Sequence, residues 1–417
     1  HKFIELYIKA LKNASSQKFL DNFNSKYFEE IEENNSQLQS EVTKKDLNYY
    51  KGLGLYMFDK EFLFKRAKYI NDRLNNYANL NDKKKKFNYA NSMQLNLLDN
   101  KNVKYLNGEY HLSEDLIIEK NYYLLKDKKL NINEGVKIFF KEDSTLFSEG
   151  SISFNGSKEK PILVYSDNGN GSLILSNNDY TFKNVIFQNL SFPKNTDKIL
   201  YGGINIINSN LNMKDIEILD SNSEDAINII SSKSYIQNLA INNAVADAID
   251  IDFGELVFEN IFCKNILNDC LDVSGGKIKG KDLRTMNIKD KGLSFGENST
   301  GSLSNINFDN NKLAIAIKDG SELSLSKYKL TNNEYDIAVF NKKQEYEGSK
   351  LQLDIMTNHS KLKILLGVNN EIIANSTIEI QKLKNKYINS LFYWFYDWIK
   401  SWKKICLWHK LQWFHKK

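Results

Sequence analysis

The chain has 417 residues, more than a single compact core accommodates, so two or three structural units are expected. Its formal net charge is +5, but residues 381–417 hold nine Lys against one Asp, so the rest of the chain sums to −3. This balance excludes nucleic-acid binding based on overall charge, because the basic excess lies in a short tail.

Residues 1–98 are predicted to be helical. Ile4, Ile8 and Leu11 recur at the spacing of one helix face. From Val103 onward the apolar residues alternate with a period of two, between frequent glycines. Strands therefore begin near that residue.

The three cysteines are few and lack metal-ligand spacing. They are Cys263, Cys270 and Cys406, an odd number with no pair two residues apart. This pattern predicts neither a disulfide framework nor a zinc site.

The decisive feature is a pattern that returns every 22 residues, a period typical of coiled repeat proteins. In each copy the third and fifth positions are aliphatic or aromatic, so they point into a core, while the position between them points outward. The copies are Asp225–Ile229, Asp247–Ile251, Asp269–Val273, Lys291–Phe295, Leu313–Ile317 and Tyr335–Val339.

A second column of polar residues supports a coiled chain. Asn243, Asn265, Asn287 and Asp309 fall one repeat apart, where amides can stack and form hydrogen bonds along a bend. A leucine-rich repeat is the closest alternative, because its period of 20–29 residues includes this value. Its fixed leucines and helical segment are missing, which favours coils built from strands.

Further segments before the repeats are also built from short strands and glycine turns. Together with the repeats, they make about residues 103–345 resemble right-handed parallel β-helix proteins; the segments are Asn133–Phe140, Gly150–Gly156 and Pro161–Val164. Pectate lyases, polygalacturonases, uronan epimerases and phage tailspikes share this architecture. The resemblance implies contact with carbohydrate as a tendency of the class, since fold alone does not fix function.

The predicted fold is therefore mainly β. A right-handed parallel β-helix, or solenoid, follows a helical N-terminal region and precedes a C-terminal amphipathic helix. The predicted units are 1–98 (helical), 99–345 (β-helix), 346–380 (closing β coils or a small β unit) and 381–417 (a basic, Trp-rich helical tail).

The outward positions of two successive copies are acidic. Asp250 and Asp272 are predicted neighbours on adjacent coils, about 4.8 Å apart, with Asp252 one pleat along and Asp247 and Asp269 at the preceding bend. Crowded carboxylates either hold protons or surround a cation, and hard oxygen ligands suit Ca²⁺. The alternative is that these residues only close turns and face water.

Further along the same face, the side chains become mixed in charge. Lys318 is the first candidate for a base that removes a sugar proton, with Lys291 nearby, provided that the pKa of the lysine is lowered. The residues expected to contact substrate are Asp252, Ser294, Glu297 and Asp319. This set is similar in residue types to pectate lyases that use Ca²⁺ and a Lys base, whereas an ordinary surface Lys remains the alternative.

A hydrolase would instead use Asp250 and Asp272 as acid and base across a glycosidic bond. The chain has no His between His111 and His359, and Arg284 is the only Arg after residue 98. These absences argue against mechanisms like those of polygalacturonases and His-dependent epimerases.

The tail combines an aromatic face with basic residues. Residues 388–414 carry Trp394, Trp398 and Trp402 among several lysines, and their apolar run is too short to span a bilayer. Such a helix fits a membrane interface, a cap on the last coil, or a partner protein.

Two functions follow from this sequence. The first is an extracytoplasmic, Ca²⁺-assisted lyase or hydrolase that acts on an acidic polysaccharide. The second is a non-catalytic surface or adhesion protein that binds glycan or cation through the same acidic residues.

Overall fold

Two compact units, His1–Ser92 and Met93–Lys417, divide the chain. The computed structural model describes residues 2–27, 29, 64, 67–72, 74, 95–194, 196, 199–343, 345–354, 362–374 and 380–382.

The described part of the first unit is helical, as predicted. Helix α1 spans Lys2–Ala14, and residues 17–27 and 67–72 are also helical. Ser15 Oγ donates a hydrogen bond to Asn71 Oδ1 at 2.9 Å, and Asn71 Nδ2 donates one to the Ser15 carbonyl at 2.9 Å, which joins two of these segments. Among the described residues, no helix combines the length and apolar character needed to cross a membrane.

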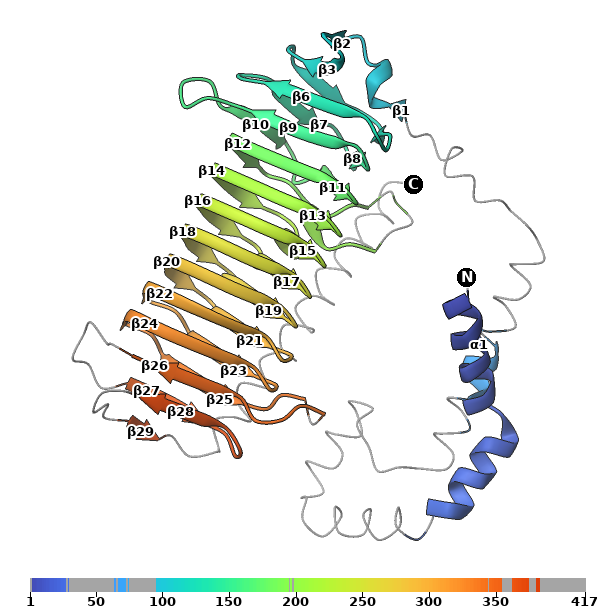
Figure 1. Ribbon diagram of the computed structural model, residues 1–417, viewed down its shortest axis with the longest axis vertical. Helices are drawn as coiled ribbons and strands as arrows, with labels where there is room; N and C mark the ends of the chain where they lie inside the picture. The colour runs from blue at the N-terminus through green and yellow to red at the C-terminus, as the bar shows by residue number, and fades with distance from the viewer. Residues whose placement is uncertain are drawn as a thin grey trace, which may run out of the picture. The chain divides into compact units, whose positions relative to one another are not determined.

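The described strands of the second unit form two long sheets, here called sheet A and sheet B (Figure 1). Sheet A is 13-stranded and contains β1 (Leu95–Asn96), β5 (Tyr122–Leu124), β8 (Thr145–Ser148), β11 (Ser172–Ser176), β13 (Gly202–Ile207), β15 (Asp225–Ile230), β17 (Asp247–Asp252), β19 (Leu271–Ser274), β21 (Lys291–Gly296), β23 (Leu313–Lys318), β25 (Tyr335–Phe340), β27 (Leu362–Leu366) and β29 (Ile380–Lys382). A short 3₁₀ turn, η1, follows β1 at Leu97–Asp99.

Sheet B is 16-stranded and faces sheet A across the core. It contains β2 (Val103–Leu106), β3 (Glu109–Leu112), β4 (Leu116–Ile118), β6 (Lys129–Asn133), β7 (Lys137–Phe140), β9 (Ser151–Asn155), β10 (Ile162–Ser166), β12 (Asp179–Gln188), β14 (Asn210–Ser221), β16 (Lys233–Ala244), β18 (Glu255–Ile266), β20 (Lys277–Ile288), β22 (Thr300–Asp309), β24 (Glu322–Thr331), β26 (Lys350–Leu353) and β28 (Glu371–Ala374).

Apart from the antiparallel hairpin of β2 and β3, the neighbouring strands of each sheet belong to successive coils and run parallel. Residue 249 pairs with residue 271, and residue 271 with residue 293, so one turn of the chain takes 22 residues. The described strands complete about 12 turns, and the described part of the second unit is a right-handed parallel β-helix, which confirms the predicted fold class.

The inner face of this β-helix is a continuous apolar core. All the residues predicted at the third and fifth repeat positions are at most 1% exposed, from Ile227 and Ile229 through Ile337 and Val339. Removing each such side chain from water contributes roughly 1.5–3 kcal/mol, so the repeat pattern supplies most of the driving force for coiling.

Left-handed backbone positions form the bends of each coil. The predicted Asn column is confirmed at Asn243, Asn265 and Asn287, whose φ angles are 63°, 57° and 61°. Asn265 Nδ2 donates to Asn243 Oδ1 at 3.0 Å, and Asn287 Nδ2 donates to Asn265 Oδ1 at 2.7 Å. Asn fits here because other side chains pay roughly 1–2 kcal/mol in this conformation.

The fourth member predicted for that column is wrong. Asn310, with φ of 55°, takes the left-handed position, and Asp309 ends β22 as the register partner of Met286. The physical reason is a longer turn: three residues separate β21 from β22, whereas two separate β19 from β20. The extra residue displaces the second half of that coil.

A disulfide bond also corrects the prediction from cysteine count. Cys263 on β18 and Cys270 before β19 are bonded, with their Cα atoms 5.9 Å apart. Both are fully buried in the core. The bond joins the sheet B and sheet A segments of one coil, a proximity that the separation of seven residues did not reveal.

At the C-terminal end, the strands β26 to β29 pair in parallel with the coils before them, so they continue the β-helix. The predicted amphipathic helix within residues 388–414 lies outside the described residues. Its proposed roles as cap, membrane contact or partner site stay predictions.

We expect Asn265→Ala to lower the free energy of unfolding by about 1–3 kcal/mol, because it loses two hydrogen bonds and strains a left-handed residue. The matched variant Asn265→Gly loses the same bonds but fits the backbone, so its loss should be smaller. Urea denaturation followed by circular dichroism measures both. Equal losses for the two variants would show that backbone strain plays no part.

Candidate functional site

On five successive coils, the outer face of sheet A carries a polar side chain at the fourth repeat position. The register along this column runs Asn205, Asn228, Asp250, Asp272 and Ser294. Asp250 and Asp272 are therefore neighbours on adjacent strands, as the period predicted. Their side chains are partly exposed, which leaves them open to a ligand.

A second column lies at the first repeat position and is buried. Asp225 and Asp247 are register partners, and Asp247 Oδ1 accepts a hydrogen bond from the N–H of Asp269 at 2.7 Å. Asp269 Oδ1 accepts one from the N–H of Lys291 at 2.9 Å, and the Lys291 ammonium lies 3.2 Å from the same oxygen. The predicted cation ligands Asp247 and Asp269 thus already hold protein groups at the bend.

We call the aspartates of these two columns, together with Asp252, the acidic strip. Its members are Asp225, Asp247, Asp250, Asp252, Asp269 and Asp272.

Burial holds much of the acidic strip in the protonated form. Burial, followed by repulsion from Asp225 and Asp272, raises the pKa of Asp250 from 3.8 to about 9. Burial and neighbouring carboxylates also raise the pKa values of Asp225 and Asp247 well above the ordinary range. At neutral pH, Asp250 therefore carries a proton that it can donate.

Asn228 connects the two columns. Its Nδ2 donates to Asp225 Oδ2 at 2.9 Å and to Asp250 Oδ2 at 3.0 Å. Asn228 was not among the predicted site residues, although it occupies the same outward repeat position as Asp250 one coil earlier. Its sequence signal is the polar side chain at the fourth repeat position, which it shares with Asp250 and Asp272.

The pKa of Asp272 is shifted in the opposite direction from that of Asp250. Burial alone would raise its pKa, but the lysines Lys318 and Lys291 outweigh that effect, and the pKa lies below the ordinary value of 3.8. Lys318 Nζ is 4.0 Å from Asp272 Oδ1, and the lysine is 8% exposed. Asp272 is therefore an ionised carboxylate beside protonated Asp250.

Lys318 reaches Asp272 because the intervening coil has a glycine. A Cβ atom on Gly296 would lie 2.8 Å from Lys318 Cε, so a larger residue would push the lysine away. Ser294 is the register partner of Asp272 on the next coil. It is fully buried, and its Oγ makes no hydrogen bond of ordinary geometry. Asp272 Oδ1 likewise lacks a hydrogen-bond partner.

Asp252 joins this group from one pleat along. It pairs in register with Ser274, is half-buried, and has its pKa raised by burial and then by Asp272 and Glu297. Lys291 is bound to Asp269 and Asp290, and its pKa is raised by the neighbouring carboxylates despite burial. A raised pKa makes Lys291 a poor base.

The structure does not bring Glu297 and Asp319 into the acidic strip. Asp319 Oδ1 accepts hydrogen bonds from the backbone N–H groups of Lys342 at 2.6 Å and Lys343 at 2.8 Å. Glu297 Oε1 accepts one from Lys343 Nζ at 2.5 Å. Both side chains hold the segment that follows β25, although they were predicted to contact substrate.

An apolar cluster bounds the acidic strip on the C-terminal side. It continues the same outer face of sheet A and consists of Leu313, Ala316, Ala338, Phe340 and Leu365, with Tyr335 packed against it. The acidic strip is therefore confined to the coils of β15, β17 and β19.

The arrangement of carboxylates does not amount to a ready cation site. Among the described residues, no group of three or more His, Cys, Asp or Glu side chains is placed to hold a metal ion. Asp250, Asp252 and Asp272 are the predicted Ca²⁺ ligands on the outer face; Asp250 would have to lose its proton, and the three side chains would have to converge.

The fold and this site define a parallel β-helix protein with a carboxylate pair on one outer face. No protein-family model and no curated protein sequence matches the chain. Similar solved structures include a double mutant of the periplasmic alginate epimerase AlgG, with 9% identity and a TM-score of 0.33, over 67% of this chain and 78% of that chain. Another is the catalytic domain of a GH87 α-1,3-glucanase in complex with tetrasaccharides, with 10% identity and a TM-score of 0.31, over 62% of this chain and 64% of that chain. Both scores are low, so these likenesses add nothing about the activity of this chain.

We expect the stability of the protein to depend on the proton of Asp250. Its pKa is raised in the folded state, so the stabilisation is complete below 3.8 and is lost as pH rises towards about 9. The free energy of unfolding should fall across this range in wild type and fall less in Asp250→Asn, which cannot ionise. Urea denaturation at several pH values, with a chelator present, measures the difference.

The control is Asp167→Asn, a change at an exposed loop residue, which should reproduce the wild-type dependence. Parallel curves for wild type and Asp250→Asn would contradict the raised pKa.

Proposed function

We propose that this chain is a carbohydrate-active β-helix protein that cleaves glycosidic bonds with Asp250 and Asp272. The observation that carries the proposal is a pair of register partners whose pKa values are pushed in opposite directions. Such divergence assigns one carboxyl group as acid and the other as base or nucleophile. Asp250 would be the acid.

The spacing of the pair supports one stereochemical course. Parallel side chains on adjacent strands keep their carboxyl groups at about the strand spacing of 4.8 Å. Retaining glycosidases place the two groups about 5–5.5 Å apart, and inverting enzymes need more room for a water molecule. We therefore assign the retaining course to this site.

In that course, Asp250 protonates the glycosidic oxygen as the bond to the anomeric carbon breaks, and an Asp272 oxygen bonds to that carbon. Water then attacks the glycosyl ester and gives its proton to Asp250, which frees Asp272 as a carboxylate. Lys318, 4.0 Å from Asp272, keeps it ionised between turnovers. Asp252 and the lysines of this face suit an acidic or mixed-charge glycan.

Lyase chemistry is the second candidate. In it, Lys318 would remove a sugar proton while a Ca²⁺ ion held by Asp250, Asp252 and Asp272 stabilised the negative charge. The observation that favours it is that Lys318 lies on the same outer face as these carboxylates, with its Nζ 4.0 Å from Asp272 Oδ1. The hydrolase assignment is preferred because it needs no rearrangement of the carboxylates.

A non-catalytic surface or adhesion protein is the remaining alternative. The same acidic strip would then bind glycan or cation without reaction. The buried members of the strip, which hold protein N–H groups, favour this alternative because they stabilise the coil without facing a substrate.

An extracytoplasmic location is also proposed. The buried disulfide between Cys263 and Cys270 supports it, because such bonds form and persist in oxidising compartments.

We expect wild-type protein to release reducing ends from at least one member of a panel of uronic-acid and mixed-charge polysaccharides, with retention of anomeric configuration by NMR. Asp250→Asn and Asp272→Asn should each lower the rate by about 10²–10⁴-fold, whereas Asp167→Asn should leave it unchanged. Absorbance of unsaturated sugar ends, with and without Ca²⁺, separates lyase from hydrolase activity. If neither product exceeds that of Asp250→Ala/Asp272→Ala, the enzyme assignment fails and the binding function stands.

The Ca²⁺ proposal has its own test. If Ca²⁺ binds the acidic strip of the folded protein, the melting temperature of the protein should rise with Ca²⁺ concentration through the millimolar range. Asp252→Asn should weaken this rise. Differential scanning calorimetry with Mg²⁺ as the matched cation measures this shift. An unchanged melting temperature would remove Ca²⁺ from the proposed function.

A further inference from the structure

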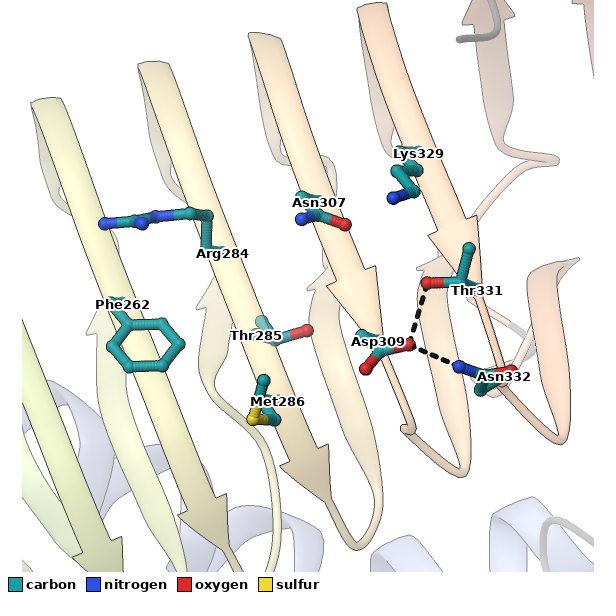
Figure 2. A pocket seen from close by; sticks show the side chains of 9 residues that line it. All are labelled: Phe262, Arg284, Thr285, Met286, Asn307, Asp309, Lys329, Thr331 and Asn332. Atoms are coloured by element: carbon teal, nitrogen blue, oxygen red, sulfur yellow. Dashed lines mark hydrogen bonds between the residues drawn. The ribbon is translucent and has the colours of Figure 1, made fainter. Parts of the chain in front are cut away.

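The outer face of sheet B holds a second site, distant in the coil from the acidic strip. Two adjoining hollows of about 470 and 530 Å³ share Arg284 and Asn307 (Figure 2). The first is lined by Phe262, Arg284, Thr285, Met286, Asn307, Asp309, Lys329, Thr331 and Asn332. Their volumes lie in the range of small-ligand sites, roughly 300–1,000 Å³. Together they are called the sheet B groove.

The centre of the groove is a column of four register partners. Phe262, Arg284, Asn307 and Lys329 occupy equivalent outward positions on β18, β20, β22 and β24. Each is one strand spacing, about 4.8 Å, from the next. An aromatic ring, a guanidinium, an amide and an ammonium therefore follow one another along the axis of the β-helix.

The two cations of this column lack acidic partners. Arg284 Nη2 donates to Asn260 Oδ1 at 2.8 Å, and its guanidinium carbon lies 5.4 Å from the centre of the Phe262 ring. Lys329 is exposed. Neither forms an ion pair with any carboxylate of the described coils, so most of the five Arg284 donors face solvent.

The carboxylates of the groove, in contrast, already have partners. Asp309 accepts hydrogen bonds from Thr331 Oγ1 and Asn332 Nδ2, both at 2.8 Å (Figure 2). Asp282 accepts one from Asn305, and Glu259 pairs with Lys281 at 3.6 Å. The first hollow therefore holds two cations, Arg284 and Lys329, against one carboxylate, Asp309, whose oxygen already accepts two hydrogen bonds.

We propose that the sheet B groove binds a carboxylate-bearing oligosaccharide of hexuronate type. Arg284, whose guanidinium carbon lies 5.4 Å from the centre of the Phe262 ring, presents a fork that fits a carboxylate bidentately. Asn307 can bond a sugar hydroxyl, and Phe262 and the 40% exposed Met286 offer apolar surface to the ring. Lys329, two strands from Arg284 and thus about 10 Å away, meets the carboxylate of a further sugar.

The site does not depend on the proposed cleavage by Asp250 and Asp272, because it lies on the other sheet. The binding test therefore uses the Asp250→Asn/Asp272→Asn variant, in which the acidic strip cannot turn over substrate. If the cleavage proposal fails, no sugar ends are released by the wild-type protein; if this site fails, the inactive variant does not bind the oligosaccharide.

The experiment is isothermal titration calorimetry with a tetramer of galacturonate, compared with a neutral glucose tetramer and with tetraglutamate. We expect binding of the galacturonate tetramer alone. Arg284→Ala should weaken it by about tenfold to a hundredfold, since a hydrogen bond to a charged group contributes about 1.5–3 kcal/mol. Arg284→Lys should recover part of the loss, because it keeps the charge without the fork.

The matched control is Lys279→Ala, an exposed lysine of the same sheet outside the groove, which should leave the affinity unchanged while Lys329→Ala lowers it. Unchanged melting temperatures exclude misfolding of each variant. Equal binding of the neutral tetramer, equal binding of tetraglutamate, or an unchanged affinity of Arg284→Ala would each overturn the assignment.

Discussion

The stacking of equivalent residues at the strand spacing governs this molecule. A residue 22 positions away in the chain becomes a neighbour at about 4.8 Å, so each outward position is repeated as a column. Identical charges in such a column repel, and the column is stable only where protons, amides or lysines intervene. Asn228 at one end and Lys318 at the other meet this requirement for Asp250 and Asp272.

The repeat alone was enough to predict the coils, the inward residues and the pairing of Asp250 with Asp272, because these depend only on period and alternation. What a side chain binds at a bend depends instead on turn length and on the neighbouring coil. Asp269 forms an ion pair with Lys291, and Asp319 accepts hydrogen bonds from two backbone N–H groups. The repeat period alone predicts neither contact. The bond between Cys263 and Cys270 was missed in the same way.

The two outer faces of the β-helix solve the problem of stacked charge differently. On sheet A, burial keeps Asp250 protonated, while the neighbouring lysines keep Asp272 ionised, so two adjacent aspartates differ in charge. On sheet B, amides and hydroxyls satisfy Asp309 and its neighbours, and Arg284 keeps its donors. One repeat thus places carboxylates of opposite protonation on one side and an arginine with unpaired donors on the other.

The hairpin of β2 and β3 has a consequence for how molecules of this protein meet. β2 is the outermost strand of sheet B at the N-terminal end, and it is antiparallel to β3, while the coils beyond are parallel. The hydrogen-bonding pattern on its free edge therefore differs from that of a parallel ladder. A second β-helix that paired with this edge would meet a reversed strand in place of a further parallel coil.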